Sequence, residues 1–98
     1  MKYELKIRKE AEFDIDEHFS SYEELRIGLG HDFLLCVEEA LSKIQRNPLI
    51  YKVIYKSLRR IPIRRFPYRL FYAIENEIVV ITAVFHAHKD PLSLESRT

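Results

Sequence analysis

The sequence predicts a small α+β domain in which a two-helix hairpin packs on one face of a sheet, in the order β-α-α-β-β-β. Three patterns predict this class: hydrophobic residues alternate near the N-terminus, recur at helical spacing over residues 11–44, and alternate again from residue 58. A chain of 98 residues has the length of one domain with one modest core. We therefore expect residues 1–98 to form a single domain around a small antiparallel or mixed sheet.

The first strand is expected over residues 2–8, because Tyr3, Leu5 and Ile7 alternate with charged residues. A helix is expected next, since hydrophobic residues at steps of three and four share one helical face. This face comprises Ala11, Ile15, Phe19, Tyr22 and Leu25. The acidic residues of the helix, including Asp14, are expected to lie largely off it.

Gly28 and Gly30 are expected to separate this helix from a second one. The second helix is expected to bury a stripe formed by Phe33, Val37, Ala40, Leu41 and Ile44. Asn47-Pro48 ends it, because proline disfavours the helical conformation of the residue before it. Cys36 lies beside the stripe, so a buried structural thiol is expected.

Residues 49–57 fit a loop or a short turn, and the strand period returns at Leu58. Pro62 lacks an N–H group, so the strand that contains it is expected to be paired on one side there. Phe66-Pro67 predicts a turn or bulge before a strand over Tyr68–Glu75. Asn76 tolerates a positive φ and is therefore expected at the tip of the following hairpin.

The last strand, Ile78–His86, is apolar on both faces, which predicts a central strand that is covered on both sides. Strict alternation puts Ile78, Val80 and Val84 on one face and Val79, Ile81, Ala83 and Phe85 on the other. The helices cover one face of the sheet, and only the polar residues 89–98 remain for the other. We therefore expect an exposed apolar groove that a protein partner covers.

Basic residues are concentrated in one segment of the chain. Residues 1–50 hold 7 Lys/Arg against 11 Asp/Glu, and residues 70–98 hold 2 against 4. Between Lys52 and Arg69 there is no acid, and the basic residues are Lys52, Lys56, Arg59, Arg60, Arg64, Arg65 and Arg69. The formal net charge of +1 thus hides a polarised molecule, which favours an anionic partner at one region.

Three of these arginines form a candidate site. Strand alternation places Arg60 and Arg64 on one face, and Arg69 joins them from the next strand if the hairpin register allows. Guanidinium groups bind phosphates and carboxylates through two-point contacts. The alternative is a solvated strand edge, whose charges prevent edge-to-edge aggregation.

His86 and His88 form a second candidate site at the end of the last strand, followed by Lys89. Two histidines on one face can serve as a general acid and base near neutral pH. The alternative is a strand end that enters solvent. A third ligand at suggestive spacing is lacking, so we expect no metal and no cofactor.

The sequence also indicates the cellular compartment in which the protein is expected. The sequence contains no run of about 18 apolar residues, so no membrane span is expected. The charged N-terminus does not fit a secretion signal. A lone cysteine fits a reducing compartment, and we expect a cytoplasmic protein.

Four segments in this order resemble the RelE/ParE superfamily of bacterial type II toxins. They are Leu29-Gly30-x-x-Phe33, Ile44-x-x-Asn47-Pro48, residues 64–72 (RRFPYRLFY), and Ala83-Val84-x-His86-x-x-Lys89-Asp90-Pro91. The resemblance implies a small, growth-inhibiting toxin, of the kind that also stabilises plasmids, encoded beside an antitoxin whose C-terminal segment wraps and neutralises it. A dimer, or a heterotetramer with the antitoxin, is also implied.

The superfamily holds two activities, and the resemblance favours one. RelE-like members cleave mRNA on the ribosome without a metal, whereas ParE-like members poison DNA gyrase. Of the basic residues that the ribonuclease branch uses, the resemblance implies counterparts here at Arg60 and Arg69. His86 or His88 stands where that branch has a further arginine. Pro62 falls where a lysine is expected, and no tyrosine follows Tyr72.

The ending His86-x-x-Lys89-Asp90 is nearer to the ParE-like branch. We therefore expect a gyrase-directed toxin that is not an enzyme, with a ribosome-dependent endoribonuclease as the alternative. Contacts to the target or to the antitoxin are expected from Arg60, Arg64, Arg65, Arg69, His86 and Lys89. A ribonuclease would use Arg60, Arg69, His86 and His88.

Overall fold

The computed structural model describes residues 3–97 of the chain. Its helices and strands are β1 (Glu4–Ile7), α1 (Lys9–Leu25), α2 (Leu29–Arg46), β2 (Val53–Tyr55), β3 (Leu58–Pro62), β4 (Tyr68–Glu75) and β5 (Ile78–His86). Two short 3₁₀ helices complete it, η1 (Pro48–Ile50) and η2 (Pro91–Arg97). The predicted α+β class and the order of its main elements are confirmed.

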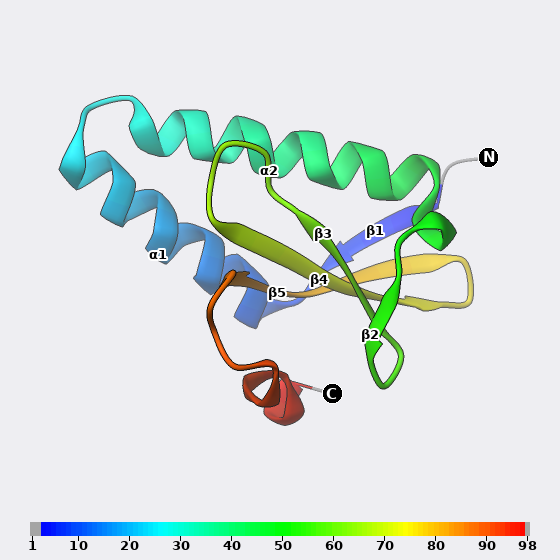
Figure 1. The fold of residues 1–98 in the computed structure, drawn as a ribbon. Coiled ribbons are helices and arrows are strands. Elements are labelled where there is room, and N and C mark those ends of the chain that lie inside the picture. The colour runs from blue at the N-terminus through cyan, green and yellow to red at the C-terminus, as the bar shows by residue number, and fades with distance from the viewer. Residues whose placement is uncertain (1–2, 98) are drawn as a thin grey trace.

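The five strands form one mixed sheet in the order β1-β5-β4-β3-β2. β1 runs parallel to β5, and every other neighbouring pair is antiparallel. The helices α1 and α2 cover one face of the sheet, which we call the helix side, and η2 lies against the other, which we call the outer face (Figure 1). The molecule therefore has three layers, with β5 in contact with both outer ones.

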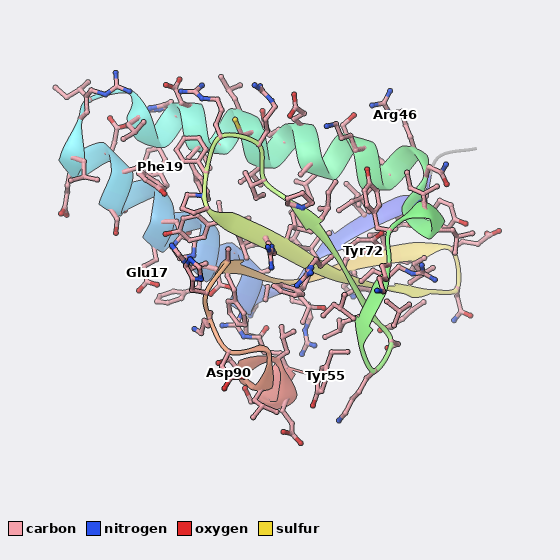
Figure 2. All side chains as sticks on the ribbon, viewed as in Figure 1. Glu17, Phe19, Arg46, Tyr55, Tyr72 and Asp90 are labelled. Carbon is pink, nitrogen blue, oxygen red and sulfur yellow. The ribbon has the colours of Figure 1, made fainter. Side chains whose placement is uncertain are left out.

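The helical hairpin is closed by a carboxylate of α1. Glu23 accepts hydrogen bonds from the backbone N–H groups of Gly28, at 3.0 and 3.1 Å, and of Gly30, at 2.8 Å. Gly28 has a φ of 91°, which favours glycine. A Cβ on Gly30 would lie 2.7 Å from the carbonyl oxygen of Phe19, so the two helices approach closely here (Figure 2).

The core on the helix side matches most of the predicted helical faces. Phe33 and Ile44 of α2 are fully buried together with Leu70 and Tyr72 of β4. The Tyr72 hydroxyl donates a 2.6 Å hydrogen bond to the carbonyl of Pro48 and so fixes η1 to the sheet. Cys36 is buried in α2, as predicted for a structural thiol.

Two predictions for α1 were wrong. Leu25 is 75% exposed, because the helix ends where the hairpin turns away from the sheet. Asp14, placed off the buried face, is only 6% exposed. Its carboxylate is buried because the backbone of β5 and Arg97 supply hydrogen bonds to it.

The face assignment of β5 was wrong beyond Ile81. The register between β4 and β5 shifts there, so that Tyr72 opposes Ile81 but Phe71 opposes Ala83. Thr82 is therefore an extra residue, a β-bulge. As a result Val84 joins Val79 and Ile81 on the helix side, while Ala83 and Phe85 turn to the outer face.

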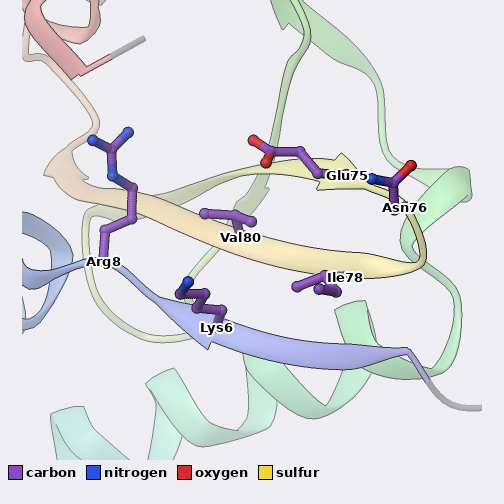
Figure 3. Close-up of a pocket in the computed structure, with 6 residues that line it drawn as sticks. All are labelled: Lys6, Arg8, Glu75, Asn76, Ile78 and Val80. Carbon is purple, nitrogen blue, oxygen red and sulfur yellow. The ribbon is translucent and has the colours of Figure 1, made fainter.

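The outer face is better covered than the sequence indicated. η2 places Leu94, which is fully buried, on an outer cluster formed by Leu58, Phe71, Ala73, Ala83, Phe85 and Leu94. The expected apolar groove is therefore closed over this part of the sheet, and a groove lined in part by Ile78 and Val80 is open beside β1 (Figure 3). Within residues 3–97, no helix is both long and apolar enough to cross a bilayer.

β2 was not predicted, because residues 49–57 lack a strand pattern. It is held by pairing to β3 and by the guanidinium of Arg59, which donates to the carbonyls of Leu49 and Tyr51 at 3.2 and 2.6 Å. Pro62 lies beyond this pairing, opposite Arg69 of β4 only. It is thus paired on one side, as predicted.

Candidate binding site

Two arginines of the predicted site share the outer face of the sheet. Arg60 of β3 opposes Phe71, and Arg69 of β4 opposes Phe85, and both phenylalanines belong to the outer cluster. The two arginines stand diagonally on neighbouring strands, within reach of one extended ligand. Within the described residues neither of them forms an ion pair. Both are therefore available to an external anion.

Arg64 and Arg65 do not join them. β3 ends at Pro62, so strand alternation does not extend to these residues, and both reach the helix side instead. Arg64 Nε lies 2.9 Å from Glu39 Oε1, and an Arg65 nitrogen lies 3.8 Å from Asp32 Oδ2. The hydrogen bond from Arg64 lowers the pKa of Glu39 and raises that of the arginine itself. These two arginines tie the β3–β4 turn to α2.

The ring of Phe85 makes cation–π contacts with two further basic side chains. Lys89 Nζ lies 4.3 Å and the Arg97 guanidinium carbon 4.7 Å from the ring centroid. Lys89 is exposed, whereas Arg97 is largely buried in a bidentate pair with Asp14, at 2.6 and 3.2 Å. Lys89 thus extends the cationic surface of Arg60 and Arg69 beside an aromatic ring.

The predicted histidine pair forms, but on the other side of the sheet. The rings of His86 and His88 lie 5.3 Å apart, and the His88 N–H donates to His86 Nδ1 at 3.1 Å. His86 opposes Tyr68, and their rings lie 5.4 Å apart. Tyr68 packs against the core of the helix side. Arg69 and His86 therefore belong to opposite faces.

Two residues that the sequence did not single out fix this region. Asp14 Oδ2 accepts a 3.0 Å hydrogen bond from the Val84 N–H, and His18 Nε2 donates to the Val84 carbonyl at 2.9 Å. The His18 ring also lies 4.2 Å from the ring of Tyr68. The two side chains are four residues apart on α1 and so share a face. A four-residue spacing of polar groups is too common in helices to have signalled this role.

A titratable group of the helix side has a shifted pKa. Burial and the neighbouring Tyr68 raise the pKa of Tyr22 to about 12, so it stays neutral at physiological pH. Within residues 3–97 no cluster of three His, Cys, Asp or Glu could hold a metal ion. Two cations on one face, Arg60 and Arg69, can bind the phosphate or carboxylate groups of an anionic partner.

Comparison with known proteins agrees with this fold. The profile of the family described as "ParE toxin of type II toxin-antitoxin system, parDE" matches residues 5–91. No curated protein matches the chain. Among solved structures, one described as the chromosomal ParDE TA system from P. aeruginosa superposes with a TM-score of 0.78 at 15% identity, covering 87% of this chain and 96% of that one.

RelE proteins share the fold at lower scores. A chain of the toxin–antitoxin complex RelBE2 from Mycobacterium tuberculosis has a TM-score of 0.60 at 26% identity, covering 88% of this chain and 99% of that one. A mutant of the E. coli toxin RelE in the free state has a TM-score of 0.61 at 19% identity, covering 99% and 94%. The family profile spans most of the sequence, and the chain belongs to the ParE toxin family of type II toxin–antitoxin systems.

Proposed function

We propose that this toxin inhibits DNA gyrase and is neutralised by a cognate antitoxin. The family profile that matches is that of ParE toxins. The TM-score to the P. aeruginosa ParDE structure, 0.78, also exceeds the scores to the RelE structures, which lie between 0.56 and 0.63. These findings support the gyrase-directed branch that the ending of β5 predicts.

The observation that carries the proposal is the separation of Arg60 and Arg69 from His86. Cleavage of RNA by attack of its 2′-hydroxyl requires a base and an acid beside the cations that support the phosphate. Arginine is a poor base, because its pKa lies above about 12. Since the arginines lie on the outer face and His86 on the helix side, the surface is suited to binding rather than to cleavage.

An antitoxin partner fits the charge distribution and the relatives. Solved structures of similar toxins include complexes described as RelBE toxin–antitoxin complexes. The cations of the outer face here would attract an acidic segment of such a partner, whereas the many carboxylates of α1 would repel it. We place the first contacts of the partner at Arg60, Arg69 and Lys89.

The test is a supercoiling assay with purified toxin and gyrase. We expect the wild type to inhibit, the Arg60→Glu/Arg69→Glu variant to lose at least about tenfold in potency, and the control Arg64→Glu/Arg65→Glu to retain it. No inhibition by the wild type at stoichiometric excess would refute the proposal.

A second assay addresses the ribonuclease alternative. mRNA cleavage at codon positions in a translation reaction would support that branch instead. His86→Ala/His88→Ala would then show whether the histidines supply its acid and base.

A further inference from the structure

Three aliphatic side chains are exposed close together at the β2 end of the sheet, which is the end opposite β1 (Figure 1). Leu49 and Ile50 of η1 are 59% and 64% exposed, and Val53, the first residue of β2, is 43% exposed. They fall within five residues of the chain, and we call them the edge patch. Neighbouring exposed aliphatic side chains of this kind mark contacts with other proteins, whereas single ones are ordinary.

Hydrogen bonds from the sheet hold the edge patch in place. Pro48, which precedes it, is fully buried, and its carbonyl accepts the 2.6 Å hydrogen bond from the Tyr72 hydroxyl. The Arg59 guanidinium donates to the carbonyls of Leu49 and Tyr51, at 3.2 and 2.6 Å. The backbone of η1 is therefore tied to the sheet while its last two side chains are exposed. A surface that is ordered before binding loses little conformational entropy when a partner arrives.

The segment that carries the edge patch is basic. Residues 40–74 contain nine Lys or Arg and no Asp or Glu. Arg46, at the end of α2, and Lys52, between η1 and β2, flank the patch and are exposed (Figure 2). Neither forms an ion pair within residues 3–97. Lys56 lies 5.5 Å over the ring of Tyr55, which packs on the outer cluster, so the cations continue from this edge toward Arg60.

These features define the surface that fits the edge patch. An apolar centre with a cationic rim is complementary to an apolar depression that has carboxylates around it. A second copy bound through the same patch would bring Arg46 and Lys52 of both copies together, and like charges repel.

A flexible peptide also fits the edge patch less well than a folded protein does. A peptide loses its conformational freedom on binding and needs a long contact surface to offset that cost. The edge patch offers only three side chains on a fixed backbone. Its size and order therefore favour a depression that is already formed on a folded partner.

We propose that the edge patch contacts gyrase, at an apolar depression of gyrase that has carboxylates at its rim. The inference rests on the proposed function and names a contact surface for it. Because Tyr55 joins this edge to the outer cluster, the edge patch extends the surface formed by Arg60 and Arg69 to the end of the sheet.

The test compares two pairs of exposed aliphatic residues, by inhibition of supercoiling and by binding of the purified toxin to immobilised gyrase. Leu49→Ala/Ile50→Ala should lose about tenfold or more in both measurements. The control Leu25→Ala/Leu35→Ala changes residues of the helical hairpin that are 75% and 64% exposed, and should change both by less than about twofold. Since all four side chains are largely exposed, thermal melting should show that both variants fold.

A charge reversal tests the carboxylates expected on gyrase. Lys52→Glu should lower the association rate constant by about fivefold at low salt, and the difference should shrink as salt screens the charges. Lys9→Glu, the same change at an exposed position at the start of α1, should alter that rate by less than about twofold. An unchanged or faster association of Lys52→Glu would overturn the acidic rim.

The outcomes separate this inference from the function on which it rests. If the wild type inhibits gyrase and Leu49→Ala/Ile50→Ala inhibits and binds equally well, only the inference is overturned. If the wild type neither binds nor inhibits gyrase, the proposed function is refuted, and the inference falls with it. Sedimentation velocity tests a second copy as the occupant. A wild-type dimer that Leu49→Ala/Ile50→Ala converts to a monomer would overturn the choice of gyrase.

Discussion

The two faces of the sheet differ in the apolar surface they bury and in the charge they present. The helix side buries large side chains such as Phe33 and Tyr72 under two long helices whose surfaces carry most of the acids. The outer face buries a smaller cluster under the single short helix η2, and its surface carries Lys6, Arg60 and Arg69. Stability is therefore expected mainly from the helix side, and recognition from the outer face.

The largest expected effect is on core packing. Phe33→Ala should lower the free energy of unfolding by about 4 kcal/mol, and Leu94→Ala by about 2–3 kcal/mol, because the thin outer layer can relax around the smaller side chain. Urea denaturation measures both. Leu92→Ala, at a position that is 64% exposed on the same short helix, is the control and should change stability by less than about 0.5 kcal/mol. A larger loss of stability for Leu94→Ala than for Phe33→Ala would contradict the expectation that the helix side contributes most of the stability.

The next effect concerns the ion pair that joins the two layers. Arg97→Ala leaves the buried carboxylate of Asp14 without its guanidinium partner and should cost about 3 kcal/mol. Arg64→Ala removes an ion pair of similar length from an exposed site, and its cost should be much smaller. Thermal melts of both variants at one pH make the comparison. Equal losses of stability in the two variants would contradict the prediction, because they would mean that burial of an ion pair does not change what its removal costs.

Alkaline pH should weaken the helix side selectively. Burial raises the pKa of both Tyr22 and Tyr72 to about 12, so the folded state favours their neutral forms. This contribution to stability is fully present below about pH 10 and is lost as the pH rises toward 12. Urea midpoints at pH 9 and pH 11.5 measure the loss. Tyr72→Phe should lose less than the wild type over that interval, and an equal loss would contradict the prediction.

The smallest effect is expected at the turn between the helices. Hydrogen bonds from Gly28 and Gly30 lower the pKa of Glu23 below its ordinary value of 4.5. The stabilisation is present above that value and is lost as the pH falls through the lowered pKa of the folded state. Glu23→Gln should therefore flatten the fall of the melting temperature below about pH 5. Glu24→Gln, on the exposed side of α1, should leave that fall as in the wild type.

Much of the fold could be predicted from hydrophobic periods alone. Tyr68–Glu75 and Ile78–His86 are strands with the predicted bounds, because each alternates or is apolar throughout. The hairpin tip at Asn76 has the expected positive φ of 51°. Three features could not be read in this way. β2 forms only through contact with β3, the bulge at Thr82 adds a residue without changing composition, and η2 looks polar apart from its leucines.

The candidate site was predicted in part. Arg60 and Arg69 share a face as expected, because both lie on regular strands of one hairpin. The prediction that Arg64 shares a face with Arg60 was wrong. β3 ends at Pro62, and side chains beyond the last paired residue need not alternate between the two faces of the sheet. The role of Asp14 was missed for a different reason. A buried carboxylate depends on partners 70 and 83 residues away in the sequence, which no local pattern reveals.

The pairing of Asp14 with Arg97 also has a consequence for synthesis of the chain. It closes a loop of 83 residues, so it cannot form until Arg97 has left the ribosome. All five strands precede Leu94 in the chain, so Phe71 and Phe85 are synthesised before the residue that covers them. The outer face can therefore be covered only after η2 has been synthesised. A short segment at the C-terminal side, Pro91–Arg97, thus decides whether this apolar surface is covered.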